Sequence, residues 1–473
     1  MARVTAQDFY DYDKCPHRVY LNRFGDSNEK LPQSDFLNLL FERALFHERD
    51  VITDLPYEMP KGSTLEEQAR STIQLMEAGV ERIYHGVFLQ DEASGIPDLL
   101  EKTNGKSRFG DHFYKPVDIK SGSGYEDEDR GILRADYGTQ LYHYGVLLKG
   151  AQGSFPPDGE ILNRRRERVL YRLDQFKNLY QDVFPDVRDL ATGARRDEPA
   201  RCGACIQCQW WGHCEKVLLA ANDVSLLPDI GRTKKAMLNG AGVHSIHDIP
   251  KFDFAAVKLK GIGPKTLDSM KRSAEVALSG KPVFLGKVPL RDAALKIYFD
   301  FEDDPTQELI YLCGSWVEPA IHGLNYHGLF CTDETGEAKM WSDFQQLCGA
   351  IQSQDYIVFH YSTYERTKIR MLERKYGVRE QCSLELFKSR MVDLLPIVEQ
   401  SVVLPARGYG LKYVAPFAGH TYSAENAGGA QSIVWFHEYQ RNPSRSDVLE
   451  KLLTYNKEDC VAMKMVEGWL RKI

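Results

Sequence analysis

Asp118 and Lys120 stand two residues apart in the stretch PVDIKSG, and Asp98 lies earlier, in GIPDLLEK. Both stretches have the short apolar pattern that predicts a strand. Because residues i and i+2 of a strand point to the same side, Asp118 and Lys120 would face one pocket. Carboxylates there can hold Mg²⁺ beside a phosphodiester, and a lysine can orient the attacking water and stabilise the transition state. Taken alone, D-x-K on a strand is more often a surface ion pair.

Neighbouring residues favour the catalytic interpretation. His47 lies on an expected helix over residues 36–55, and Gln140 and Tyr144 stand four residues apart on the next expected helix, QLYHYGVLL. Residues i and i+4 of a helix share a face, so Gln140 and Tyr144 can point into the same cleft as the carboxylates.

The order of His47, G-x-P-D, D-x-K and Q-x-x-x-Y resembles the RecB-type branch of the PD-(D/E)XK nucleases. The resemblance implies three metal ligands, one catalytic lysine, and two residues that contact DNA or order the site. In that order these are His47, Asp98 and Asp118; Lys120; and Gln140 and Tyr144. Every residue type of the family pattern is present, and an inactive copy of the domain is the alternative.

A second set of carboxylates lies in the last third of the chain. Asp300 and Glu302 alternate at the end of an apolar stretch, IYFDFEDD, so on a strand both would point to one side. Tyr455 and Asp459 stand at i and i+4 in LLTYNKEDCVAM and would share one helical face. Such carboxylates can hold two metal ions about 3.5–4 Å apart for in-line attack on a phosphodiester. For D-x-E alone, an acidic strand end at the surface is the simpler alternative.

D-x-E on a strand with a terminal Y-x-x-x-D resembles the DEDDy exonucleases of the ribonuclease-H-like fold. That family carries a further acid after a central strand, commonly in N-x-x-x-F-D, whereas this chain has VFHYSTYERTKI. The acid there would be Glu365, with His360 where asparagine is common; Asp393 is an alternative. The resemblance implies that four carboxylates hold the metal ions and that a tyrosine positions the water. In that order these are Asp300, Glu302, Glu365 and Asp459; and Tyr455.

Four cysteines lie close together in the stretch RCGACIQCQWWGHC. Cys202, Cys205, Cys208 and Cys214 could provide four thiolates for a tetrahedral zinc ion. Their spacing, C-x2-C-x2-C-x5-C, differs from that of zinc ribbons, which divide the ligands into two distant pairs. In the other interpretation one ligand is Cys15, from FYDYDKCPHRVYL.

One cysteine before the nuclease core and C-x2-C-x5-C after it resemble RecB-like nucleases of the CRISPR-associated and helicase-linked kinds, which hold a [4Fe–4S] cluster. The resemblance implies that Cys15, Cys205, Cys208 and Cys214 are the ligands and that Cys202 is spare. Such a cluster would close nearly the whole domain into one loop and join its two ends.

Two similar passages, IGRTKKAMLNGAGVHSIHDI and LKGIGPKTLDSMKRSAEVAL, follow the cysteines. GAGVHSIHDI and GIGPKTL resemble helix-hairpin-helix motifs, whose hairpins leave backbone N–H groups at a helix start for a phosphate. The resemblance implies that Gly261, Gly263 and Lys265 bind nucleic acid. Residues 231–280 carry nine Lys or Arg and four Asp or Glu, in a chain of formal net charge -7. This local positive charge favours phosphate binding.

These residues need several folded units to position them. A chain of 473 residues exceeds one hydrophobic core and should form about three domains. Residues 36–55 and 64–84 have helical spacing, and expected strands and helices mix at both ends of the chain, which predicts an α/β multidomain protein. With the resemblances, three domains follow. They are a PD-(D/E)XK restriction-endonuclease-like domain over residues 1–218, an all-α tandem helix-hairpin-helix domain over 219–280, and a ribonuclease-H-like domain over 281–473.

Composition and motifs limit the setting. The chain is 43% hydrophobic and 27% charged, no apolar run approaches the roughly 20 residues of a membrane span, and no signal-peptide pattern is seen. We therefore expect a cytoplasmic protein with no membrane partner. No G-x-x-x-x-G-K-[ST] motif occurs, so any unwinding would come from a partner helicase.

Together the patterns predict a metal-dependent DNA nuclease that uses Mg²⁺ or Mn²⁺ on single-stranded or branched DNA, in repair, recombination or defence. Two alternatives are a nucleic-acid-binding adaptor with one or both nuclease domains inactive, and an RNA-processing 3'–5' exonuclease.

Overall fold

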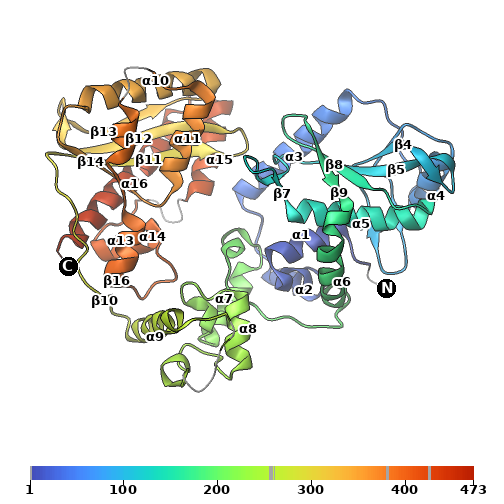
Figure 1. Ribbon diagram of the computed structural model, residues 1–473, viewed down its shortest axis with the longest axis horizontal. Helices are drawn as coiled ribbons and strands as arrows, with labels where there is room; N and C mark the ends of the chain where they lie inside the picture. The colour runs from blue at the N-terminus through green and yellow to red at the C-terminus, as the bar shows by residue number, and fades with distance from the viewer. Residues whose placement is uncertain (1–2, 255–258, 260, 380–382, 424–427, 473) are drawn as a thin grey trace. The chain divides into compact units, whose positions relative to one another are not determined.

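The computed structural model describes residues 3–254, 259, 261–379, 383–423 and 428–472. The chain divides into two compact units, Met1–Val217 and Leu218–Ile473. Each unit contains its own five-stranded sheet (Figure 1). Within the described ranges, no helix has both the length and the apolar character needed to cross a bilayer.

The sheet of the first unit is mixed and has the order β1-β4-β5-β8-β9. Its strands are β1 (Arg82–Tyr84), β4 (Leu99–Ser107), β5 (Gly110–Ile119), β8 (Asp158–Leu162) and β9 (Arg168–Arg172). β5 and β8 are parallel, and the other neighbouring pairs are antiparallel. Two short ribbons lie beside the sheet: β2 (Phe88–Leu89) with β3 (Ser94–Gly95), and β6 (Tyr125–Asp127) with β7 (Ile132–Leu133).

The central helix of the first unit is α5 (Ala135–Gln152), which packs on β5 and is buried on nearly all sides. α1 (Ala6–Lys14) and α6 (Lys177–Thr192) pack on α5, and α2 (Pro16–Phe24) packs on α1 and α6. This unit also contains α3 (Asp35–Thr53) and α4 (Leu65–Glu77).

The expected helix over residues 64–84 is shorter than its pattern suggests. α4 begins with a capping box between Thr64 and Glu67 and ends at Glu77. Gly79, with φ of +70°, then reverses the chain, and residues 82–84 become the edge strand β1. The apolar spacing after Gly79 therefore served strand pairing rather than a helix.

A helical region opens the second unit. It contains the end of α7 (Trp211–Ala220), α8 (Arg232–Gly240) and α9 (Pro264–Ser279), joined by short 3₁₀ turns. Buried apolar residues of this region include Leu238, Val243, Ile249 and Met270.

The sheet of the second unit has the order β13-β12-β11-β14-β15. Its strands are β11 (Leu295–Asp304), β12 (Leu309–Ile321), β13 (Leu324–Phe330), β14 (Tyr356–His360) and β15 (Met391–Asp393). The first three strands along the chain form an antiparallel meander, and β14 and β15 extend the sheet in parallel from β11. A short ribbon, β10 (Val283–Phe284) with β16 (Val402–Val403), lies apart from it.

Helices cover both faces of this sheet (Figure 1). Phe299 and Phe301 of β11 face a core built with α10 (Glu334–Ile351), α11 (Tyr364–Tyr376) and α12 (Leu384–Ser389). Tyr298 points to the other face, where α13 (Leu394–Ser401) and α16 (Ser446–Leu470) contribute the core. α14 (Leu411–Val414) and α15 (Gly429–Arg441) pack on α16. The alternation of β11 thus decides which side chains meet α16.

Candidate active sites

Three carboxylates of the second unit converge between β11 and α16. Asp300 and Glu302 alternate with the core residues Phe299 and Phe301, so they point to the face on which α16 packs. Asp459 reaches the same place from α16, and one oxygen of each carboxylate lies within 4.8 Å of the others. Carboxylate oxygens at this spacing are the ligands that Mg²⁺ and Mn²⁺ prefer.

Asn456 fixes the orientation of Asp300. Its Nδ2 donates to Asp300 Oδ2 at 2.8 Å, and its Oδ1 accepts from the Tyr326 hydroxyl at 2.9 Å. It lies over Gly314, the β12 residue that pairs with Asp300. A Cβ at position 314 would stand 1.5 Å from Asn456 Oδ1, so only glycine fits there. The sequence signal for Asn456 was its place three residues before Asp459, on the same helical face.

Two tyrosines and a lysine surround Asp459. The Tyr422 hydroxyl donates to Asp459 Oδ1 at 2.8 Å, and Tyr455 also hydrogen-bonds to this carboxylate. Lys412 Nζ lies 4.3 Å from the ring centre of Tyr455 and 5.0 Å from that of Tyr422. Lys412 and Tyr422 therefore lie beside the expected pair of Tyr455 and Asp459. No motif or periodicity in the sequence had indicated these two residues.

Glu365 lies next to the three carboxylates but outside their ligand group. It is 3% exposed, hydrogen-bonds to Asp300, and has its Oε2 3.3 Å from His360 Nδ1. Burial raises the pKa of Glu365 to about 8, and the charge of Asp393 adds to the rise. Asp393 itself caps α13, because its Oδ1 accepts from Leu395 N at 3.0 Å. Asp393 is thus occupied as a helix cap.

The electrostatics of this cluster favour a bound cation. Burial raises the pKa of Asp300 and Glu302 well above their usual values, and repulsion from neighbouring carboxylates adds to the rise. Burial also raises the pKa of Asp459, although the Lys412 ammonium opposes the shift. A divalent ion would offset both the burial and the repulsion.

In the first unit, Asp98, Asp118 and Lys120 meet where β4 begins and β5 ends. Lys120 Nζ pairs with Asp118 Oδ2 at 2.8 Å, and Asp118 is 1% exposed. Asp98 Oδ2 accepts from Ile119 N at 2.7 Å, and Asp98 N donates to Asp118 Oδ1 at 3.4 Å. Burial and the nearby Asp118 raise the pKa of Asp98 to about 7. Burial opposes a charged Lys120, but Asp118 and Asp98 raise its pKa overall.

Lys120 shares a pocket with Gln140 and Tyr144. The pocket has a volume of about 400 Å³, and its other walls include the β2–β3 ribbon. Gln140 and Tyr144 are both buried on α5, where Gln140 Nε2 donates to Ala6 O at 3.3 Å and the Tyr144 hydroxyl donates to Ile96 O at 3.4 Å. The size is within the usual range of ligand pockets.

The group of potential metal ligands in this unit differs from the expected one. Ligand atoms of Glu48, His85 and Asp98 lie within 4.8 Å of one another, and His47 is outside this group among the described residues. His47 and Glu48 are consecutive on α3, and consecutive helical residues point about 100° apart. The His47 ring lies instead beside the backbone of Leu162, where burial lowers its pKa. The structure thus brings Glu48 and His85 to Asp98, and Asp118 pairs with Lys120.

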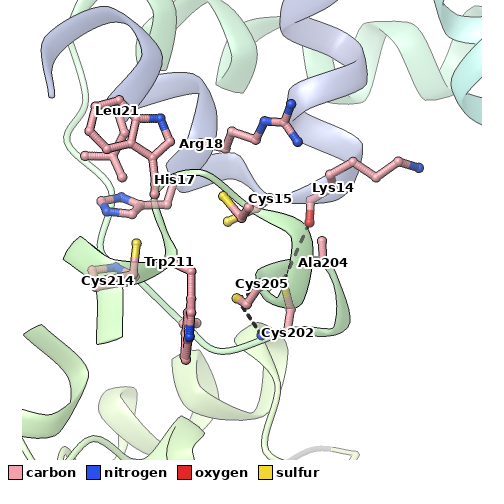
Figure 2. A pocket seen from close by; sticks show the side chains of 14 residues that line it. Lys14, Cys15, His17, Arg18, Leu21, Cys202, Ala204, Cys205, Trp211 and Cys214 are labelled. Carbon is pink, nitrogen blue, oxygen red and sulfur yellow. Dashed lines mark hydrogen bonds between the residues drawn. The ribbon is translucent and has the colours of Figure 1, made fainter. Parts of the chain in front are cut away.

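All five cysteines of the predicted cluster region line one pocket of the first unit: Cys15, Cys202, Cys205, Cys208 and Cys214. Figure 2 shows the side chains of Cys15, Cys205 and Cys214 on different sides of this hollow. Cys15 is the residue before α2, and none of the five forms a disulfide. Trp210 is 3% exposed and donates from Nε1 to Asn22 Oδ1 at 2.9 Å, so it closes the pocket as a packed wall.

The spacing of the thiols decides which metal group suits them. Four thiolates around one zinc ion, each about 2.3 Å from it, stand about 3.8 Å apart. Cys202 Sγ and Cys205 Sγ are 3.7 Å apart, but no three of the described thiols lie within 4.8 Å of one another. A multi-iron cluster needs the wider spacing, because each thiolate binds a different iron atom. Among the described thiols, Cys202 and Cys205 lie at the separation of two zinc ligands, and no three thiols are gathered as a zinc ion would require.

Gly261, Gly263 and Lys265 lie at the exposed start of α9. Gly261 has a φ of +88°, a conformation that favours glycine, and Gly263 precedes Pro264, the first residue of the helix. The first-turn N–H groups of a helix are suited to an anion such as phosphate.

The positive charge counted in this region is not all available to a phosphate. Lys235 is buried, and its Nζ pairs with Asp223 Oδ2 at 2.5 Å. Lys258 and Lys260 lie outside the described residues. The positive charge available for phosphate binding therefore comes from exposed lysines, such as Lys265 at the start of α9.

Comparison with known proteins finds a family match for one part of the chain. Residues 297–471 match the family model of the RNase H superfamily, and this range runs from β11 to the end of α16. No curated protein matches the chain. The match contains all the carboxylates and the tyrosine expected for the second site. The protein is thus a mixed α/β chain whose residues 297–471 form a ribonuclease-H-like domain, which indicates a nuclease-type hydrolase of nucleic acid.

Proposed function

We propose that this protein is a metal-dependent DNA nuclease with two hydrolytic centres, an exonuclease on single-stranded or branched DNA in repair, recombination or defence. One observation carries the proposal. The carboxylates of Asp300, Glu302 and Asp459 converge within 4.8 Å, inside the range that matches the RNase H superfamily. Mg²⁺ or Mn²⁺ held there would polarise the phosphate and activate water.

In the carboxy-terminal centre the neighbouring side chains orient the ligands and the water. Tyr455, which hydrogen-bonds to Asp459, is placed to hold the attacking water. Asn456 fixes the Asp300 carboxylate through a 2.8 Å hydrogen bond. Glu365 contacts Asp300 and supports this ligand from the second layer, a role that often changes metal affinity by about 10–100-fold.

In the amino-terminal centre the Lys120 ammonium is the group that orients the attacking water and stabilises negative charge in the transition state. Its 2.8 Å contact with Asp118 holds the ammonium beside the carboxylates, and its pocket with Gln140 and Tyr144 provides space for the substrate. Asp98 and Asp118 contribute the carboxylates of this centre. We propose that Gln140 and Tyr144 contact DNA or order the site, and that Gly261, Gly263 and Lys265 bind its phosphates.

We assign Cys15, Cys205, Cys208 and Cys214 as ligands of a [4Fe–4S] cluster, with zinc as the alternative. Support comes from the pocket that these thiols share and from the lack of any three described thiols within 4.8 Å of one another. The cluster would join the start of α2 to the segment after α6 and so hold the two ends of the nuclease domain together. Cys202 is left over, and no electron transfer is required.

The proposed domains are a RecB-like PD-(D/E)XK domain over residues 1–218, a tandem helix-hairpin-helix domain over 219–280 and a DEDDy domain over 281–473. The division of the chain into compact units after Val217 supports the first boundary. The mixed sheet β1-β4-β5-β8-β9, with Asp118 on β5, supports the first assignment. Unwinding of duplex DNA would require a partner helicase.

The test is cleavage of end-labelled substrates by the full chain. We expect single-stranded DNA to be degraded with Mg²⁺ or Mn²⁺ and to stay intact with EDTA. Matched RNA of the same sequence separates a DNA nuclease from an RNA-processing 3'–5' exonuclease. DNA that is bound but not cleaved with either metal ion would overturn the proposal and identify an adaptor.

A further inference from the structure

We propose that Glu48, His85 and Asp98 form a second divalent-cation site in the first unit, one that selects a transition-metal ion such as Mn²⁺ over Mg²⁺. The inference begins from the three ligand atoms, which lie within 4.8 Å of one another. Two oxygen ligands on opposite sides of Mg²⁺ are about 4.2 Å apart, so an ion fits between the three after only small movements. Its consequence for cleavage rests on the proposed nuclease function; its metal binding does not.

The three side chains come from separate elements of the first unit. Glu48 projects from α3, His85 follows the edge strand β1, and Asp98 precedes β4. His85 N donates to Asp98 O at 3.1 Å, so the pairing of β1 with β4 sets the distance between these two residues. Glu48 Oε1 lies 2.9 Å from His85 Nε2.

The imidazole is held in place before any ion arrives. The Tyr84 ring stacks on the His85 ring with centroids 3.8 Å apart and an interplanar angle of 23°. The Tyr84 hydroxyl also donates to Glu48 Oε1 at 2.6 Å. This bond uses only one of the two oxygens of the Glu48 carboxylate. A site whose ligands are already oriented loses less entropy when the ion binds.

The donor set determines which ion is favoured. One imidazole nitrogen with two carboxylates suits first-row transition metals, because imidazole is a borderline donor and Mg²⁺ prefers oxygen. The carboxy-terminal cluster of Asp300, Glu302 and Asp459 contains oxygen donors alone and has no such preference. The two units should therefore differ in metal selectivity.

The position of the site links it to the lysine. Asp98 is one of the three proposed ligands, and it is also hydrogen-bonded to Ile119 N and to Asp118, which pairs with Lys120. An ion held by Glu48, His85 and Asp98 would bring two positive charges into the network that holds Lys120. The simpler explanation of Glu48 and His85 is an ion pair at the protein surface that needs no metal.

Electron paramagnetic resonance with Mn²⁺ as the only added metal separates these explanations. The full chain carrying Asp300→Asn and Asp459→Asn removes binding at the carboxy-terminal cluster and serves as the background. We expect this protein to bind Mn²⁺ with a nitrogen coupling from imidazole. His85→Gln should remove that coupling and weaken Mn²⁺ at least about tenfold, while affinity for Mg²⁺ changes much less.

Two further variants keep the test sharp. His112→Gln, a half-buried histidine of β5 whose Nε2 contacts Met76 O, is the matched control and should behave as the background. Glu48→Gln should weaken Mn²⁺ but keep the nitrogen coupling. A nitrogen coupling that survives His85→Gln, or unchanged Mn²⁺ affinity in a folded variant, overturns the site. A protein that binds Mn²⁺ through His85 but cleaves no nucleic acid keeps this inference and overturns the proposed function.

Discussion

The two proposed centres both gather buried carboxylates, and they differ in how the chain compensates the negative charge. In the first unit Lys120 follows the strand that carries Asp118, and Lys120 Nζ lies 2.8 Å from Asp118 Oδ2. In the second unit the carboxylates of Asp300, Glu302 and Asp459 gather around each other, and Lys412 approaches from the side over the Tyr455 ring. Their charges are therefore less compensated by the chain itself. We therefore expect the activity of the second centre to depend more strongly on an added cation.

The largest expected difference between the units concerns the cysteines. If the proposed cluster is present, Cys15→Ser should abolish the broad absorption near 400 nm of anaerobically purified protein and destabilise the first unit, because the cluster would join its two ends. Cys202→Ser, the matched control, should keep the absorption. Visible spectra and iron analysis measure this. Loss of the cluster in both variants, or tightly bound zinc in place of iron, would contradict the ligand assignment.

The packing of the second centre provides the next test. Gly314→Ala would place a Cβ 1.5 Å from Asn456 Oδ1, so Asn456 must leave Asp300 and the second unit should lose roughly 3 kcal/mol of stability. Gly468→Ala, on α16 with no atom within 4 Å of the added Cβ, should be neutral or slightly stabilising. Denaturant unfolding measures both. An unchanged Gly314→Ala protein would show that Asn456 is not held as described.

Removal of one hydroxyl tests the role of Tyr455. Tyr455→Phe should slow cleavage by the second centre about 10²-fold, because the water loses its positioning group. The measurement uses a Lys120→Ala background, so that only the second centre contributes. Tyr376→Phe, which removes a hydroxyl that donates to Glu337 Oε2 at 2.6 Å, is the control and should change cleavage much less. Equal losses in the two variants would argue against a direct role for Tyr455.

The smallest predicted effect is a pH dependence of stability at the end of β11. Asp304 is fully buried, and although burial opposes its charge, His437, Thr306 and Gln307 lower its pKa to about 2. A carboxylate with a lowered folded pKa adds stability that is present above the unfolded pKa of about 3.9 and is lost as pH falls toward 2. The contribution is about 2 kcal/mol.

Asp98 in the first unit should show the opposite sign. Its pKa is raised to about 7, so the folded state binds the extra proton and stability falls as pH rises from about 4 to 7. Asp304→Asn and Asp98→Asn, unfolded in EDTA across this range, should each flatten one of the two dependences. The same slope in both variants would show that these carboxyls do not control it.

Local patterns predicted the parts of the sites that lie on single elements. The period of a strand predicted that Asp300 and Glu302 share a face, and the period of a helix predicted the same for Tyr455 and Asp459. These statements need only one strand or one helix, and the RNase H superfamily match covers the same residues. The ribonuclease-H-like part of the fold was predicted from the family resemblance that these residues carry, and the match over residues 297–471 supports it.

Contacts between distant elements were not predictable in this way. His85 reaches Asp98 because β1 pairs with β4, and the expected helix over residues 64–84 concealed β1. Lys412 and Tyr422 reach Asp459 from α14 and the loop after it, across a distance in sequence that no periodicity covers. His47 was named by resemblance, whereas the ligand group in the structure contains Glu48, the next residue of α3. Such choices depend on tertiary packing, which one sequence does not reveal.

The most direct test of two separate hydrolytic centres is the cleavage rate of labelled single-stranded DNA in saturating Mg²⁺ for wild type, Lys120→Ala, Asp300→Asn and the double variant. Each single variant is predicted to retain the activity of the other centre, and the double variant to lose cleavage by about 10³-fold or more. If one single variant abolishes all cleavage, or the double variant still cleaves as wild type does, the account of two centres is wrong.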